Sequence, residues 1–222
     1  MGISERRERE KEERRKTILK CAKELIVLNG VENVSMENIA QKAELSKATV
    51  YLYFSNKEIL LNEICEESAR VFLEYVKLSP ASQLTGMQAI KYFWRGFVDL
   101  FGNSDDMIII FKVRNFLGSN LPNFLLKEQS KSPNVDAILE AMKNLIEGCI
   151  AEGVFDPALD STMATQLLLS MFSIMVERAA HIPMEKRKFP AVVEEMTNSF
   201  QIIIRGFARE GIDRKALDIL ST

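Results

Sequence analysis

The sequence has few of the residues that build metal centres and disulfide frameworks. Its 222 residues include one histidine, His181, and three cysteines, Cys21, Cys65 and Cys149, which are far apart and lie in apolar segments. An odd number of widely spaced cysteines favours reduced, buried thiols over disulfides. One histidine cannot complete a metal site with distant cysteines. We therefore expect no metal, no other cofactor, and a reducing compartment, the cytoplasm.

Long apolar runs and catalytic motifs are also absent from the sequence. No hydrophobic stretch approaches the ~20 residues that a membrane span needs, and the charged first segment is unlike a signal peptide. GxSxG, HExxH, CxxC and phosphate-loop motifs are missing, and these are the patterns that place nucleophiles, metals or phosphates. We expect a protein that is not an enzyme and has no membrane partner.

Apolar residues recur along the sequence at the spacing of an α-helix. Hydrophobic residues make up 47% of the chain, enough for a buried core, and there is no sustained alternation of period two. We predict an all-α protein. After the first helices, the expected ones cover 57–78, 84–101, 105–117, 121–129, 133–153, 160–181 and 190–209, with a short segment after Asp213.

Residues 35–57, SMENIAQKAELSKATVYLYFSNK, have the pattern of a helix-turn-helix. Ser35 is expected to cap a first short helix, and Ser46 a second. In the second helix Val50 and Phe54 are four residues apart and point to the core. The residues left facing outward are Lys47, Thr49, Tyr51 and Tyr53.

A preceding apolar segment, RKTILKCAKELIVLNG, supplies the third helix that so short a pair needs, and its final Asn29-Gly30 favours a left-handed helix terminus. From Thr17 to Leu60 the sequence resembles the N-terminal signature of the TetR-type family of bacterial transcriptional repressors nearly position for position. The shared features are the alanine-rich first helix, Ile39-Ala40, Ser46-Lys47, Tyr51, Tyr53-Phe54 and Lys57-Glu58. The resemblance implies a DNA-binding region at 1–57 and a helical effector-binding and dimerisation region at 58–222.

At two positions where the family often has glycine, this chain has another residue: Glu44 in the turn and Ala48 in the second helix. A non-glycine residue in left-handed geometry costs on the order of 1 kcal/mol, so we expect the turn to be slightly strained or altered. Residues 1–57 carry 12 Lys and Arg against 9 Asp and Glu, a net charge of +3, whereas the rest of the chain carries −5. The basic excess therefore lies with the expected DNA reader.

The outward residues of this reader fall into two chemical groups. One offers hydroxyl or ammonium donors to phosphates, and in the family the matching positions hold the DNA backbone: Ser35, Thr49, Tyr53 and Lys57. The residues of the second group project into the DNA groove, where Lys47 can donate a hydrogen bond to guanine and Ala48 can contact a thymine methyl group. Ordinary exposure is the alternative for each, above all for Leu52. The predicted contacts to double-stranded DNA are Ser35, Ser46, Lys47, Ala48, Thr49, Tyr51, Leu52, Tyr53 and Lys57.

The first segment, ERREREKEERRK, has two interpretations. Its five glutamates are interleaved with seven basic residues, and three i,i+4 pairs worth only ~0.2–0.5 kcal/mol each suit a solvated extension of the first helix. Alternatively, Arg14, Arg15 and Lys16 reach phosphates or a minor groove, as N-terminal extensions do in similar proteins.

Aromatic residues and methionines are abundant after residue 58. Most must be core, because helical bundles need such stripes. The resemblance implies a ligand cavity among these helices, and a soft, apolar lining implies a mostly apolar effector of unknown identity. The predicted lining is Phe93, Trp94, Phe97, Phe111, Met142, Met171 and Met175, with a structural role equally open for Trp94. Candidate polar anchors, each also a surface candidate, are Arg95, Arg114, Glu177 and Arg178. His181 is expected to be exposed or at an interface.

The last two long helices are apolar on several sides. In 160–181 the polar residues fall on one narrow stripe, and a helix so apolar needs two neighbours. In 190–209 apolar residues alternate at spacings of three and four, and Gly206 permits close approach. As in similar proteins, we predict a four-helix homodimer interface from Met163, Leu167, Met171, Ile174, Val193, Met196, Phe200, Ile203 and Phe207.

Together these features predict a transcriptional regulator, specifically a repressor that an apolar effector releases from a palindromic operator. A two-fold dimer would present its two recognition helices ~34–36 Å apart. The competing interpretation is a helical scaffold or dimeric binding protein whose helix-turn-helix only packs. The joint presence of Lys47, Thr49, Tyr51, Tyr53 and Lys57 argues against it.

Overall fold

The computed structural model describes residues 3–77, 84–118 and 132–219, and this part of the chain is all-α, as predicted. The helices are α1 (Ile3–Asn29), α2 (Met36–Lys42), α3 (Lys47–Tyr53), α4 (Lys57–Lys77), α5 (Gly86–Asn103), α6 (Asp106–Gly118), α7 (Pro133–Ala151), α8 (Ser161–Ala179) and α9 (Pro190–Gly206), with 3-10 turns at Met184–Lys186 and Arg214–Leu217. From α4 onward the predicted bounds agree within three residues. The helix predicted at 121–129 lies outside the described residues. None of the described helices combines the length and the apolar character that crossing a membrane requires.

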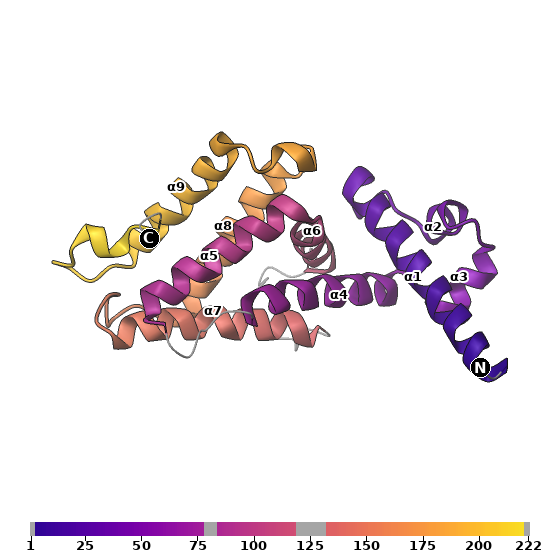
Figure 1. The fold of residues 1–222 in the computed structure, drawn as a ribbon, viewed down its shortest axis with the longest axis horizontal. Coiled ribbons are helices and arrows are strands. Elements are labelled where there is room, and N and C mark those ends of the chain that lie inside the picture. The colour runs from indigo at the N-terminus through magenta and orange to yellow at the C-terminus, as the bar shows by residue number, and fades with distance from the viewer. Residues whose placement is uncertain (1–2, 78–83, 119–131, 220–222) are drawn as a thin grey trace.

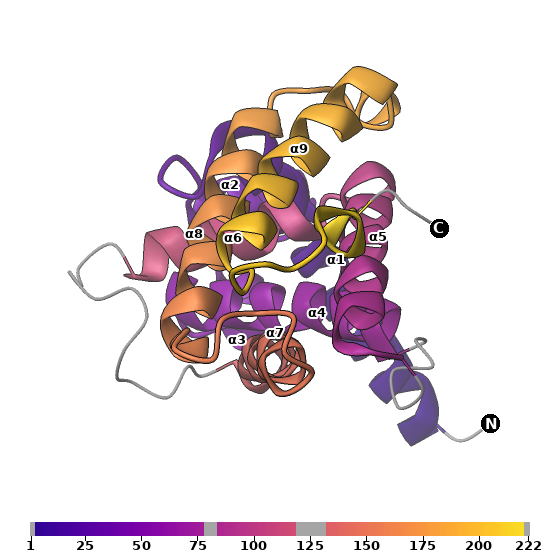
Figure 2. The same ribbon diagram turned by 90° about the vertical axis from the view of Figure 1, so that its left-hand side faces the viewer.

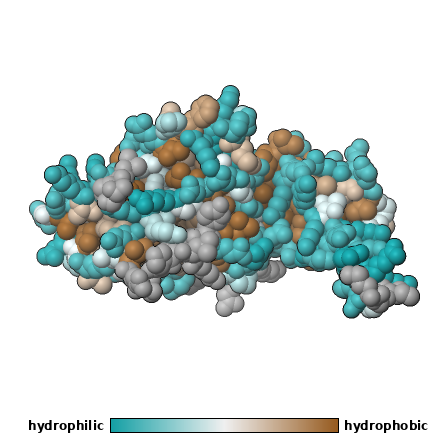
Figure 3. Space-filling model, in the orientation of Figure 1, coloured by the Kyte–Doolittle hydropathy of each residue, from teal (hydrophilic) through white to brown (hydrophobic). Residues whose placement is uncertain are grey.

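The N-terminal segment continues α1 as a solvated helix. Its side chains are exposed, and Arg6 forms an i,i+4 ion pair with Glu10 at 2.9 Å. In Figure 3 the coloured part of this extension, at the lower right, is mostly hydrophilic. Arg15 is the exception, because its guanidinium turns to α4, pairs with Glu63 at 2.6 Å and lies 5.7 Å from the ring centroid of Phe54.

Helix α4 joins the two ends of an elongated molecule (Figure 1). The reader, α1 to α3, forms one end, and α5 to α9 form the other. Helix α4 packs on α5, α6 and α7 as well as on α1, and α8 and α9 lie side by side (Figure 2). The buried apolar residues form one continuous cluster from Ile18 to Ile219. Both ends of the molecule therefore share a core.

A stack of aromatic rings holds α5, α8 and α9 together. The Trp94 ring lies 5.4 Å from Phe97, 6.1 Å from Phe172 and 4.5 Å from Phe200, in each case nearly parallel. Its indole N–H donates to Thr197 Oγ1 at 3.2 Å, so the one polar atom of the stack is satisfied. Trp94 therefore has a structural role in this packing.

Two glutamates hold the N-termini of helices other than their own. Glu66 of α4 accepts hydrogen bonds from the Ser132 hydroxyl at 2.5 Å and the Asn134 N–H at 2.8 Å, at the start of α7. Glu152, just after α7, accepts from the Gly86 N–H with both oxygens, at 2.7 and 2.9 Å. A Cβ on Gly86 would lie 2.7 Å from the backbone nitrogen of Cys149. Only glycine lets α5 approach α7 so closely.

Arg187, between α8 and α9, is a buried cation. It is 4% exposed, pairs with Asp105 at 2.7 Å and donates to the carbonyls of Ile182 and Ser104 at 3.1 and 3.2 Å. Its guanidinium lies 5.3 Å from the ring centroid of Phe101. The loop before α9 is thereby fixed to the corner between α5 and α6.

Candidate DNA-binding surface and ligand cavity

The helix-turn-helix forms with the predicted caps. Ser35 Oγ accepts from the Asn38 N–H at 3.1 Å, and Asn38 Oδ1 accepts from the Ser35 N–H at 3.1 Å, which closes a capping box. Ser46 Oγ accepts from the Thr49 N–H at 3.0 Å. Glu44 adopts a φ of 56° in the turn, which confirms the left-handed geometry expected where the family often has glycine.

In α3 and its C-cap, the inward and outward sides are as predicted. Val50 and Phe54 are buried, while Lys47, Ala48, Tyr51 and Leu52 are exposed, Leu52 at 84%. Thr49 and Tyr53 are half-buried at the edge of the same face. A leucine so exposed has no role in the core of this chain. The predicted groove-facing surface therefore exists, and its contacts with DNA remain a prediction.

Sequence reasoning missed a carboxylate beside this surface. Lys47 Nζ forms an ion pair with Glu37 at the start of α2 and lies 5.7 Å from the ring centroid of Tyr51. The hydrogen bond between them raises the pKa of Lys47 and lowers the pKa of Glu37. The main candidate for base contact is thus already paired within the chain. Sequence separation gave no sign of this, because the two residues lie on different helices.

Lys57, expected to contact a phosphate, turns inward instead. Its Nζ donates to the Val31 carbonyl at 2.6 Å and lies 4.8 Å from the ring centroid of Phe116. Burial lowers the pKa of this ammonium, while the charge of Glu32 opposes the shift. Lys57 therefore connects the reader to α6, and a phosphate contact would have to use its remaining protons.

A second lysine makes a similar connection. Lys112 of α6 donates to the Val27 carbonyl in the last turn of α1 at 3.3 Å. Nearby, Lys23 of α1 pairs with Glu67 of α4 at 2.8 Å and Asp106 of α6 at 3.4 Å. Polar contacts between the reader and the helices of the bundle are thus concentrated on α4 and α6.

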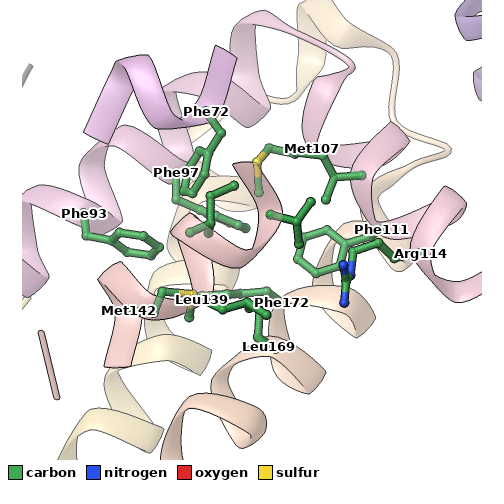
Figure 4. A pocket seen from close by; sticks show the side chains of 13 residues that line it. Phe72, Phe93, Phe97, Met107, Phe111, Arg114, Leu139, Met142, Leu169 and Phe172 are labelled. Atoms are coloured by element: carbon green, nitrogen blue, oxygen red, sulfur yellow. The ribbon is translucent and has the colours of Figure 1, made fainter. Parts of the chain in front are cut away.

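A largely apolar cavity lies among α4 to α8 (Figure 4). The cavity is narrow, with a volume of about 40 Å³. The described lining consists of Phe72, Phe93, Phe97, Met107, Ile110, Phe111, Arg114, Val135, Ile138, Leu139, Met142, Leu169 and Phe172. Arg114 is the one charged side chain among them, at one end of the cavity next to Phe111, while Phe93 is at the other (Figure 4).

Four of the predicted lining residues are in the cavity: Phe93, Phe97, Phe111 and Met142. Three assignments need correction. Trp94 is in the aromatic stack, and Met171 and Met175 line a groove between α8 and α9 instead. The sequence of α8 has apolar residues on two sides of the helix, but it does not show which side faces the cavity and which faces the groove. Among the predicted polar anchors only Arg114 lines the cavity, whereas Arg95, Glu177 and Arg178 are exposed. His181 is exposed, as expected.

In the single chain, the residues predicted for the dimer surface are mostly exposed on α8 and mostly buried on α9, and the interface itself remains a prediction. Met163, Leu167 and Ile174 are 68%, 50% and 59% exposed, an unusual set of bare apolar side chains on one helix. In contrast, Met196, Phe200 and Phe207 are buried within the chain, because α9 turns its aromatic side to Trp94 and Phe155. Val193 and Ile203 are half-buried. Sequence reasoning missed two exposed residues, Ile202 at 70% and Phe189 at 54%.

Comparison with known proteins agrees with this architecture. Residues 18–64 match the model of a family described as bacterial regulatory proteins, tetR family. The chain is 23% identical to the fatty acid metabolism regulator protein of Bacillus subtilis (strain 168) over 194 residues, 85% of this chain and 93% of that protein. It is 22% identical to an uncharacterized HTH-type transcriptional regulator, YfiR, of the same organism, over 83% of this chain and 88% of that protein.

Solved structures share the fold. The fatty acid degradation regulator FadR from Bacillus halodurans matches with a TM-score of 0.63 at 17% identity, covering 85% of this chain and 93% of that one. AibR, solved in complex with isovaleryl coenzyme A and operator DNA, matches with a TM-score of 0.62 at 21% identity, covering 87% and 98%. The relatives over most of the length are regulators, and the chain is a DNA-binding transcriptional regulator whose reader, at residues 18–64, matches the tetR family.

Proposed function

We propose that this regulator is a homodimeric repressor that a small, mostly apolar effector releases from a palindromic operator. The observation that carries the proposal is the cavity on α4. Phe72 of α4 lines it, and Lys57 at the start of the same helix contacts the reader through Val31. A ligand that moves α4 or α6 would therefore displace the DNA-binding surface. Because it acts on the chromosome, we place the protein in the cytoplasm.

The names of two relatives suggest a class of effector. One is a fatty acid metabolism regulator, and another was solved with isovaleryl coenzyme A. An apolar cavity that ends in a guanidinium suits a compound with a hydrocarbon part and an anionic part. We propose acyl compounds as the first candidates to test.

The proposed dimer joins α8 of one chain to α8 and α9 of a second copy. Support comes from Met163, Leu167, Ile174 and Ile202, which are exposed apolar residues in a single chain, and from the groove between the two helices. A two-fold axis there would present two α3 helices to successive major grooves ~34–36 Å apart, so the operator would be a palindrome.

Fluorescence anisotropy with genomic DNA fragments tests the DNA-binding half of the proposal. We expect sequence-selective binding that weakens with salt. Tyr51→Ala should mainly relax the sequence preference, and Lys57→Ala should lower the salt slope by ~1 if its remaining protons reach a phosphate. An unchanged slope for Lys57→Ala would mean that Lys57 contacts Val31 and Phe116 but no phosphate. Absence of salt-sensitive, selective binding would favour the scaffold alternative.

Titration of a cavity ligand into the operator complex tests the regulatory half. Effector and operator should weaken each other's binding by the same factor, a coupling of ~1–3 kcal/mol. The effector needs only to prefer the released conformation. A ligand that raises Tm and occupies the cavity, yet leaves the operator Kd unchanged, would refute release by this route.

A further inference from the structure

The cations of the helix-turn-helix are engaged within the chain. Residues 35–57 contain three lysines, Lys42, Lys47 and Lys57. Lys42 pairs with Glu24 of α1 at 2.9 Å, Lys47 pairs with Glu37, and the third lysine donates to a backbone carbonyl of the reader. Attraction between free lysines and phosphates is independent of sequence and supplies most non-specific binding. A reader whose lysines are engaged therefore binds arbitrary DNA less strongly than its number of basic residues implies.

The ion pair of Glu37 and Lys47 lies beside the groove-facing residues of α3. Glu37 is in the first turn of α2 and Lys47 is the first residue of α3, so the pair joins the N-terminal ends of the two helices. Both side chains are more than half exposed, so neither belongs to the core. The ammonium also lies 5.7 Å from the ring centroid of Tyr51. Lys47 is thus held by a carboxylate and by an aromatic ring.

Glu37 is a fixed negative charge on this surface. The hydrogen bond from Lys47 lowers the pKa of Glu37, and a hydrogen bond from its own backbone N–H acts in the same direction. A negative charge in the first turn of a helix is also stabilised by the helix dipole. The carboxylate therefore stays ionised next to the surface that faces an anionic duplex. Its charge opposes the approach of DNA of any sequence.

We propose that Glu37 determines the sequence selectivity of the reader by positioning Lys47. The inference rests on the proposed contact of α3 with the DNA groove. An ammonium has several donor protons, so Lys47 can keep its ion pair and still donate to the acceptor atoms of a guanine. A lysine that is already oriented loses less conformational freedom when it binds that base. Arbitrary DNA meets the carboxylate without this gain, and its binding is therefore weakened more.

Glu37→Gln tests this role, because it removes the charge and keeps the size of the side chain. The probes are a duplex that the full-length wild type selects from genomic fragments and a scrambled duplex of the same composition, and their Kd values are measured by fluorescence anisotropy at several salt concentrations. At low salt the scrambled duplex should bind about fivefold tighter to the variant, and the selected duplex less than about twofold tighter. Selectivity, the ratio of the two Kd values, should therefore fall. An unchanged or increased selectivity would overturn the proposal.

Glu24→Gln is the matched control. It also removes a carboxylate that pairs with a lysine of the helix-turn-helix, but this pair joins α1 to Lys42 in the last turn of α2 instead of the start of α3. The selectivity of Glu24→Gln should equal that of the wild type. A fall as large as that of Glu37→Gln would mean that net charge alone sets the selectivity, and it would overturn the proposal. The Tm of each variant is measured first, and both exposed substitutions should leave it unchanged.

A double variant separates positioning of the lysine from simple repulsion of DNA. In a Lys47→Met background, Glu37→Gln should leave the selectivity unchanged, because no lysine remains to be oriented. A fall as large as in the wild-type background would show that Glu37 acts through its own charge, and it would overturn the positioning role. The wild-type assay is read separately. A wild type that selects no duplex would refute the proposed function, whereas a selective wild type with an equally selective Glu37→Gln would refute only this inference.

Discussion

Replacing Arg187 by methionine removes a buried cation that fixes the loop before α9. Removal of one partner of a buried ion pair costs ~3–5 kcal/mol, because the other charge is left uncompensated. The partner here, Asp105, has a side chain that is 32% exposed, so its carboxylate regains part of its hydration. Methionine also preserves some of the apolar contact with Phe101. We therefore expect Arg187→Met to lower the free energy of unfolding by about 3 kcal/mol, near the lower limit of that range.

Urea denaturation followed by circular dichroism measures this loss. The protein concentration must be held constant, because the stability of a dimer depends on it. Arg70→Met is the matched control: Arg70 pairs with Glu74 at 2.5 Å, but the two side chains are 54% and 60% exposed, and such pairs are worth ~0–1 kcal/mol. A loss below about 1 kcal/mol for Arg187→Met, or equal losses for the two variants, would refute the argument that burial decides the magnitude.

Three further predictions concern DNA, assembly and pH. Glu37→Gln should release Lys47 and strengthen binding to any duplex, with a salt slope steeper by about 1; weaker binding in the anisotropy assay would count against it. Leu167→Glu should yield monomers in sedimentation velocity at micromolar concentration, and an intact dimer would exclude this part of α8 from the interface. Burial raises the pKa of the Cys149 thiol from 9.0 to about 12, so between these values the unfolded chain binds fewer protons and stability falls as pH rises. Cys149→Ala should lose Tm less steeply over pH 9 to 11, and parallel curves would remove the thiol as a cause.

The reader could be predicted in detail because local rules determine it. Caps, turn geometry and the inward pair Val50 and Phe54 depend on residues within a few positions of one another. The strained turn at Glu44 could be expected only from the resemblance, because glycine is frequent at this position in the family. The inward turn of Lys57 could not, since its partners Val31 and Phe116 belong to segments whose positions no local pattern gives.

The orientation of apolar helices was the weaker part of the prediction. Periodicity shows that α9 is apolar at spacings of three and four, but it does not say which neighbour covers which side. Phe200 was expected at the dimer surface and instead stacks on Trp94. Arg114 could be named only as one of four candidate anchors, because the sequence does not reveal which charged residue of a helix borders a cavity.

The last turn of α1 is completed by side chains from outside the reader. The final carbonyls of a helix have no partner within it, and here Lys112 of α6 donates to Val27 while Lys57 donates to Val31 just beyond the helix. The reader is therefore not a portable module. A fragment cut after Lys57 would lose Lys112 and the ring of Phe116, and its first helix would fray at Asn29. A chimera that joins this reader to the bundle of another regulator needs a cation at the position of Lys112, so compatibility at this junction limits which regulators can exchange their DNA-binding ends.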